Sequence, residues 1–176
     1  MFSNKDLRQL IFPLILELLL TLLVGMIDSI MVSSVSESAV SGVSLIDTIM
    51  QLLIYIFAAL GTGGAVVAGQ YLGSGSHENA CKSTEQLIWF SGIVSIFITV
   101  FVICLKGLML DHLFGQITPE VREYANIYLT ITAFSIPAIA LYEAGAATFR
   151  TMGNSKVTMW ISVMMNLINI VGNSIL

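Results

Sequence analysis

The stretch LIFPLILELLLTLLVGMIDSIMVSSV, residues 10–35, is a long apolar run with only two charged side chains, Glu17 and Asp28. As an α-helix, roughly 20 such residues cross the hydrocarbon core of a bilayer. The whole chain is 56% hydrophobic and only 10% charged, whereas a soluble domain carries about 25% charged residues. We therefore expect the lipid bilayer to surround the chain. Because no basic stripe is available to neutralise phosphates, we expect no nucleic-acid partner.

Five segments are long and apolar enough to span a membrane, and together they predict an all-α, polytopic transmembrane helical bundle. Strands of a membrane barrel would instead alternate apolar and polar residues over about 10 positions. Pro137, inside the fourth segment, is expected to kink its helix. The predicted helices cover approximately residues 10–35, 45–71, 86–105, 121–149 and 157–176.

The positions of lysine and arginine predict the orientation of the bundle. With the N-terminus in the cytoplasm, only Lys106 and Arg122 fall outside the cell. The other five fall inside, as the positive-inside rule requires: Lys5, Arg8, Lys82, Arg150 and Lys156. The sequence therefore predicts a multi-pass protein of the cell membrane with a cytoplasmic N-terminus.

Asp28 is the most unusual residue of the first helix. An aspartate at the centre of a spanning helix costs about 2.5–3.5 kcal/mol. Asp28 is therefore either a hydrated residue at the outer interface or a carboxylate that faces a cavity and exchanges protons. Asn166, Asn169 and Asn173 lie on one face of the last helix because they are spaced three and four apart. They either join helices by hydrogen bonds or serve as partners for Asp28.

Other polar side chains are weaker candidates for a cavity. Glu17 lies 11 residues, or about 16 Å of helix, before Asp28, and is either an inner relay position or an acid that reaches the cytoplasmic interface. Glu143 either faces a cavity or pairs with another charge, while Gln51 and Tyr55 are candidate cavity-lining residues. Asp47 is expected to cap the second helix. The glycines of GTGGAVVAG, residues 61–69, are expected to let neighbouring helices approach closely.

Three pieces of the chain, taken together, resemble the N-terminal half of a MATE (multidrug and toxic compound extrusion) transporter. They are VGMIDSIMVSS (24–34) with Pro13 before it, GTGGAVVAGQYLGSGSHENA (61–80), and FRTMGNSKVTMWISVMMNLINIVGNSIL (149–176). The resemblance implies a twelve-helix antiporter built as two six-helix lobes, of which this chain supplies five helices of the first lobe. Because the sequence stops in mid-helix, we expect that a C-terminal lobe is missing from it.

The resemblance also implies a site. Asp28 matches the first-helix aspartate assigned to cation coupling in the family, and Asn169 and Asn173 match positions that complete a cation site in some members. Those members carry an aspartate in place of Asn173. A sodium ion at Asp28, Asn169 and Asn173 is thus one expectation, but the lost carboxylate favours protons as the coupling ion.

The function that these observations favour is multidrug efflux: the export of organic-cation drugs or metabolites in exchange for protons or sodium, with no further cofactor. The alternative is a flippase for lipid-linked oligosaccharides from the same superfamily. That class needs basic residues for a pyrophosphate, whereas the predicted helices carry acids. An intramembrane enzyme such as a diaspartyl protease needs a GxGD motif, which Asp28 does not have. We therefore expect a transporter and not an enzyme.

Overall fold

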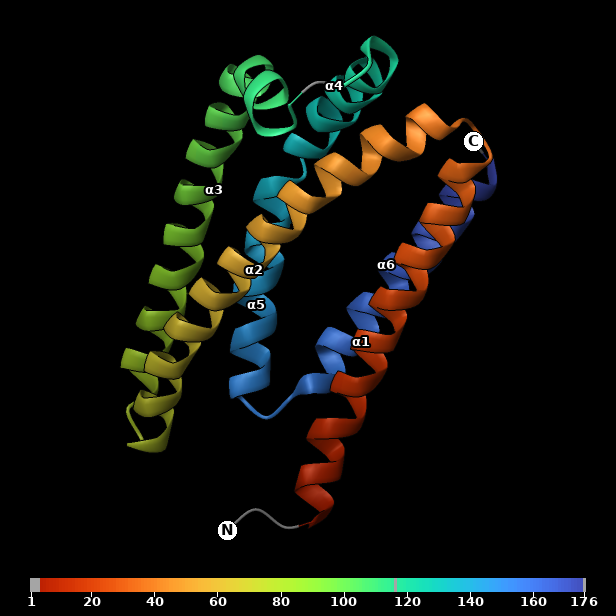
Figure 1. Ribbon diagram of the computed structural model, residues 1–176. Helices are drawn as coiled ribbons and strands as arrows, with labels where there is room; N and C mark the ends of the chain where they lie inside the picture. Colours follow the sequence, from red (N-terminus) through yellow and green to blue (C-terminus); the bar gives the residue numbers. More distant parts are fainter. Residues whose placement is uncertain (1–3, 116, 176) are drawn as a thin grey trace.

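The computed structural model describes residues 4–115 and 117–175, which fold into α-helices without strands (Figure 1). This confirms the predicted all-α class. In chain order the helices are α1 (Asn4–Ser33), α2 (Glu37–Gly73), α3 (His77–Leu113), α4 (Pro119–Ala133), α5 (Ile136–Thr151) and α6 (Ser155–Ile175).

Within the described residues, α1, α2 and α3 are each long and apolar enough to cross a membrane. In α1 the candidate span is Ile11–Ser33. α4 and α5 pass the same test only as a pair, bent by 50°, which makes up to four spans. The predicted fifth span, 157–176, corresponds to the continuous helix α6 but is not among those four.

The fourth predicted span is broken at Phe134 and Ser135. The break follows from Pro137 in the first turn of α5, because proline has no N–H to donate to the carbonyl four residues earlier. The N–H groups of Phe134 and Ser135 instead bond to Ile131 and Thr132, three residues back. The predicted kink at Pro137 is therefore confirmed.

The helices extend further than the apolar runs suggested. α2 begins at Glu37, and its N-cap is Ser36, whose hydroxyl accepts a hydrogen bond of 3.0 Å from the Ala39 N–H. The prediction that Asp47 caps this helix is wrong, because Asp47 lies ten residues inside it. Polar residues continue a helix beyond the bilayer as readily as apolar ones, so hydropathy marks the span and not the helix.

The helices form two groups that we call the body and the arm. The body comprises α2–α5, which share a core that includes Ile46, Phe57, Leu129 and Ile136. The arm comprises α1 and α6, which run along each other (Figure 1). It meets the body where α1 contacts α2 and where α6 contacts α5.

Glycines on α2 allow the body to pack closely. A Cβ placed on Gly61 would lie 2.9 Å from the carbonyl oxygen of Glu143 on α5. A Cβ on Gly42 would lie 2.9 Å from the carbonyl oxygen of Val121 on α4. Both contacts are with backbone atoms, which cannot rotate away. The prediction of close helix approach is thus confirmed at Gly61.

Candidate functional site

A cleft of about 860 Å³ opens between the arm and the body. Asp28 reaches it from α1 and Asn169 from α6, while Asp47 and Gln51 contribute from α2 and Tyr128 from α4. The structure therefore gathers three predicted site residues, Asp28, Gln51 and Asn169, around one cavity. The described residues that line this cleft include two carboxylates and neither lysine nor arginine.

Asp47 is a member of the cleft that the sequence did not suggest. The Tyr128 hydroxyl donates a hydrogen bond of 2.9 Å to its Oδ1 atom. This contact joins α2 to α4 across 81 positions of sequence. The signal that could have found it is spacing, because Asp47 and Gln51 are one helical turn apart and therefore share a face.

The other predicted site residues lie elsewhere. Tyr55 is 64% exposed and is not among the residues that line the cleft. Asn166 donates to the Ser162 carbonyl on its own helix, at 2.6 Å. The side chain of Asn173 falls outside the described part of the structure, so the three-residue cation site is described only at Asp28 and Asn169. Glu17 and Glu143 belong to a second group of polar residues.

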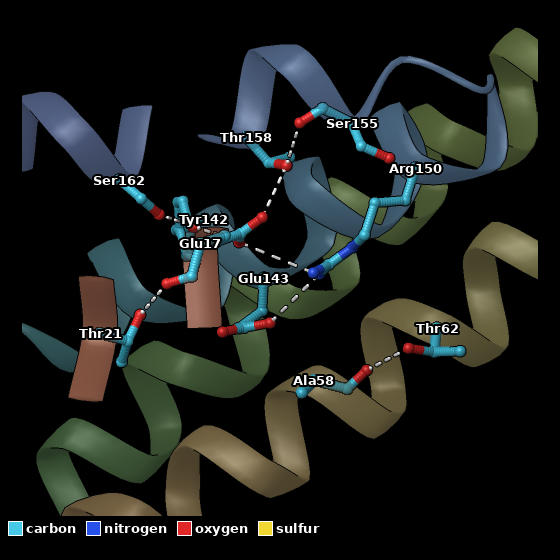
Figure 2. Close-up of polar contacts among 10 residues, drawn as sticks. All are labelled: Glu17, Thr21, Ala58, Thr62, Tyr142, Glu143, Arg150, Ser155, Thr158 and Ser162. Atoms are coloured by element: carbon cyan, nitrogen blue, oxygen red, sulfur yellow. Dashed lines mark hydrogen bonds and ion pairs between the residues drawn. The ribbon is translucent and has the colours of Figure 1, made fainter. Parts of the chain in front are cut away.

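That second group surrounds Glu17, where the arm meets α5 (Figure 2). Tyr142 donates to Glu17 Oε1 at 3.0 Å, and Thr158 donates to Oε2 at 2.8 Å. Ser162 Oγ lies 3.2 Å from the Tyr142 hydroxyl, and it is the donor when Tyr142 gives its only proton to Glu17. Glu17 is buried, so the hydroxyls replace the water that a carboxylate otherwise requires.

Arg150 connects two acids within this group. Its Nη1 atom lies 3.7 Å from Glu17 Oε1, and its Nη2 atom lies 3.8 Å from Glu143 Oε2. The side chains of Glu17 and Glu143 are only 10% and 14% exposed, against 32% for Arg150. Arg150 thus turns toward two largely buried carboxylates. We call Glu17, Tyr142, Glu143, Arg150, Thr158 and Ser162 the junction cluster.

Comparison with known proteins places the chain in a family. The sequence profile of the MatE family matches residues 13–175. The chain belongs to the MatE family. It is therefore related to membrane transporters, in agreement with the predicted resemblance.

Two related MatE proteins come from bacteria. The chain is 27% identical to the "uncharacterized transporter YisQ" of Bacillus subtilis over 96% of its own length. It is 26% identical to the "probable multidrug resistance protein NorM" of Thermotoga maritima over 95% of its length. In both cases the match spans only 36% of the relative. This MatE chain therefore corresponds to about a third of these proteins.

Solved structures have the same fold. An outward-facing multidrug resistance MATE family transporter of the MOP superfamily superposes with a TM-score of 0.89. A MOP superfamily transporter from Pyrococcus furiosus, described as having a binding pocket of reverse polarity, gives 0.87. Each is 22% identical and is matched by 97% of this MatE chain, over 38% and 37% of its own length respectively. At this identity the likeness establishes the fold alone.

Proposed function

We propose that the protein exports organic cations across the cell membrane in exchange for protons or sodium ions, with Asp28 as the coupling residue. The observation that carries the proposal is the cleft between arm and body, with Asp28, Asp47 and Asn169 on its walls. A volume of about 860 Å³ falls in the range of roughly 300–1,000 Å³ that is usual for drug-sized ligands. The two carboxylates give the cavity a negative field suited to a cation.

Exchange requires a group whose charge changes. When Asp28 is ionised it attracts a cationic drug, and when it is protonated the attraction is lost. A proton and a drug then compete for one carboxylate, which couples the inward movement of one to the outward movement of the other. An amide cannot change its charge in this way. Asn169 can hold the Asp28 carboxylate by a side-chain N–H or offer a carbonyl oxygen to sodium.

Uptake of a fluorescent organic cation into inverted vesicles, which corresponds to export from the cell, tests the proposal, with the complete gene product as the protein. Asp28→Asn preserves shape but fixes the charge at zero, so we expect export to fall to the level of empty vesicles. Glu78→Gln is the matched control, because Glu78 is an exposed acid paired with Lys82 on α3. Wild-type export by Asp28→Asn, with the same pH dependence, would disprove a coupling role.

The sign of the charge in the cleft distinguishes an organic cation from a pyrophosphate-linked lipid as the substrate. The lipid carries negative charge, which the carboxylates of Asp28 and Asp47 would repel. We therefore expect a pyrophosphate-linked lipid to leave export of the cation unchanged when both are present. Competition between the two would favour the flippase. Repeating the export assay in a sodium gradient and in a proton gradient separates the two coupling ions.

A further inference from the structure

The junction cluster has an unequal distribution of charge between the arm and the body. α1 supplies one negative charge from Glu17, whereas α5 supplies one negative charge from Glu143 and one positive charge from Arg150. α6 supplies only hydroxyls, from Thr158 and Ser162. With both acids ionised, the cluster has a net charge of −1. An uncompensated negative charge is unfavourable in a low-dielectric site, and binding of one proton would neutralise it.

The surroundings stabilise the ionised form of Glu17 more than that of Glu143. Both oxygens of Glu17 accept hydrogen bonds from hydroxyls, in addition to the ion pair with Arg150. Among the described contacts, Glu143 has the Arg150 guanidinium at 3.8 Å. Hydrogen bonds to the charged form keep a carboxylate ionised. Glu143 is therefore the acid that can accept a proton at the lower cost.

The hydrogen bonding of the junction is also incomplete. Ser155, the first residue of α6, is 1% exposed, and its hydroxyl has no hydrogen-bond partner in the part of the chain that the structure describes. Its carbonyl accepts from Thr158, the same residue that contacts Glu17. A buried donor without a partner is unfavourable and rare in native proteins. The junction therefore retains a donor that another arrangement of these residues could use.

From these observations we propose that Glu143, Glu17 and Arg150 form a second proton-binding site, at which protonation of Glu143 tightens the contact between arm and body. This goes beyond the proposed function, which needs only the carboxylate of Asp28. The proton comes from water, to which the Arg150 side chain is 32% exposed, and the predicted orientation puts this water on the cytoplasmic side. It forms an O–H bond on the Glu143 carboxyl and displaces nothing.

The direction of the effect follows from charge. When Glu143 is protonated, α5 presents a net charge of +1 to Glu17 on α1. When Glu143 is ionised, α5 presents a net charge of zero, and the two carboxylates repel each other across the junction. Two charges at a given distance interact more strongly in the protein interior than in water, because the interior has a lower dielectric constant. Low pH should therefore draw the arm toward α5, and high pH should release it.

No other element contributes a charge at this point in the described contacts. Tyr142 on α5 donates to Glu17, and α6 presents the hydroxyls of Thr158 and Ser162. α2 packs against α5 through Gly61, which meets the backbone of Glu143. Thr21 links the junction to the cleft, since it lines the cleft and donates to the Glu17 carbonyl at 3.0 Å. A movement of Glu17 would therefore reach the cleft wall.

A distance measurement between arm and body tests the proposal. Spin labels are placed on the exposed positions Arg8→Cys in α1 and Ser74→Cys after α2, in the complete gene product without other cysteines. The background carries Asp28→Asn, so that titration of the cleft carboxylate cannot produce the signal. In lipid nanodiscs we expect the distance distribution to shift to shorter values as pH falls.

Variants of the acids identify the group that takes the proton. Glu143→Gln should lose the pH-dependent shift and keep the low-pH distribution, and Glu143→Asp should restore a shift. Glu78→Gln should leave the shift unchanged. The proposal is overturned if the Asp28→Asn protein shows no pH-dependent shift, or if the shift persists in Glu143→Gln. Neither result bears on export by wild-type Asp28, so the two proposals fail separately.

Discussion

At the scale of single residues, the hydrogen-bond partners of Glu17 explain how its carboxylate can be buried. Its position near the N-terminal end of an apolar helix is compatible with an acid that reaches water. Instead it is buried, with hydroxyls from α5 and α6 on its two oxygens. Removing one partner of a buried charge leaves the charge in place without its compensation. The hydroxyl groups around Glu17 should therefore contribute measurably to stability.

Two threonines allow a matched test of this contribution. Thr158→Val removes the 2.8 Å hydrogen bond to Glu17, and we expect a loss of about 1–3 kcal/mol in stability, the usual cost of an unsatisfied buried group. Thr62→Val is the control, because Thr62 is exposed and donates only to Ala58 of its own helix in the described contacts. Its effect should stay within about 0.5 kcal/mol.

The measurement is the midpoint of thermal unfolding in detergent. The fraction of protein that stays monodisperse on heating reports the unfolding. Equal midpoints for Thr158→Val and Thr62→Val would mean that the hydroxyl does not stabilise the buried carboxylate. A lower midpoint for Thr158→Val alone is the expected result.

At the scale of helices, the contact between α2 and α5 depends on a missing side chain. Gly61 is buried against the backbone of Glu143, so the two helices lie closer than any Cβ would allow. The α5 residue at this contact, Glu143, is the one whose side chain pairs with Arg150. Small residues at such crossings are a general feature of packing between membrane helices.

Alanine substitutions on one helix test the close approach. Gly61→Ala would place a Cβ 2.9 Å from a backbone oxygen, and we expect overpacking to cost about 1–3 kcal/mol. Gly63→Ala, two residues along, meets nothing within 4 Å and should be neutral or slightly stabilising. Thermal unfolding of the two variants in parallel gives the answer. A Gly61→Ala protein as stable as Gly63→Ala would show that α2 and α5 can separate at no cost.

At the scale of the whole molecule, the long helices fix which turns share a side of the membrane. α2 has 37 residues, or about 55 Å. The turn at residues 34–36 therefore lies at the opposite end from the turn at 74–76 (Figure 1). The basic residues then predict that the first turn is outside the cell and the second inside.

Thiol labelling tests this orientation. In a Cys104→Ser background, Ser34→Cys lies in the exposed first turn and should react with an impermeant maleimide added to intact cells. Cys81 is exposed near the start of α3 and should react only after the membrane is permeabilised. Labelling of Cys81 in intact cells, with Ser34→Cys protected, would reverse the predicted topology.

The sequence by itself determined the class of the protein, because the features that define a membrane helix are local. The length of an apolar run, a proline in a span and a glycine-rich segment are all read from neighbours in the chain. They predicted the helical bundle, the bend at Pro137 and the close approach at Gly61. The helix end at Ser36 was not predicted, because the predicted helix bounds followed hydropathy and a helix cap need not coincide with a change in hydropathy.

Only the tertiary structure decided how the acids differ. Glu17 depends on Tyr142 and Thr158, which lie 125 and 141 positions away, and Asp47 depends on Tyr128, 81 positions away. No local pattern encodes which of these side chains meet. The stability of a charge inside a membrane protein is set by the donors and opposite charges around it. For Glu17 those neighbours meet only after the arm has packed against the body, and for Asp47 only after α4 has packed against α2.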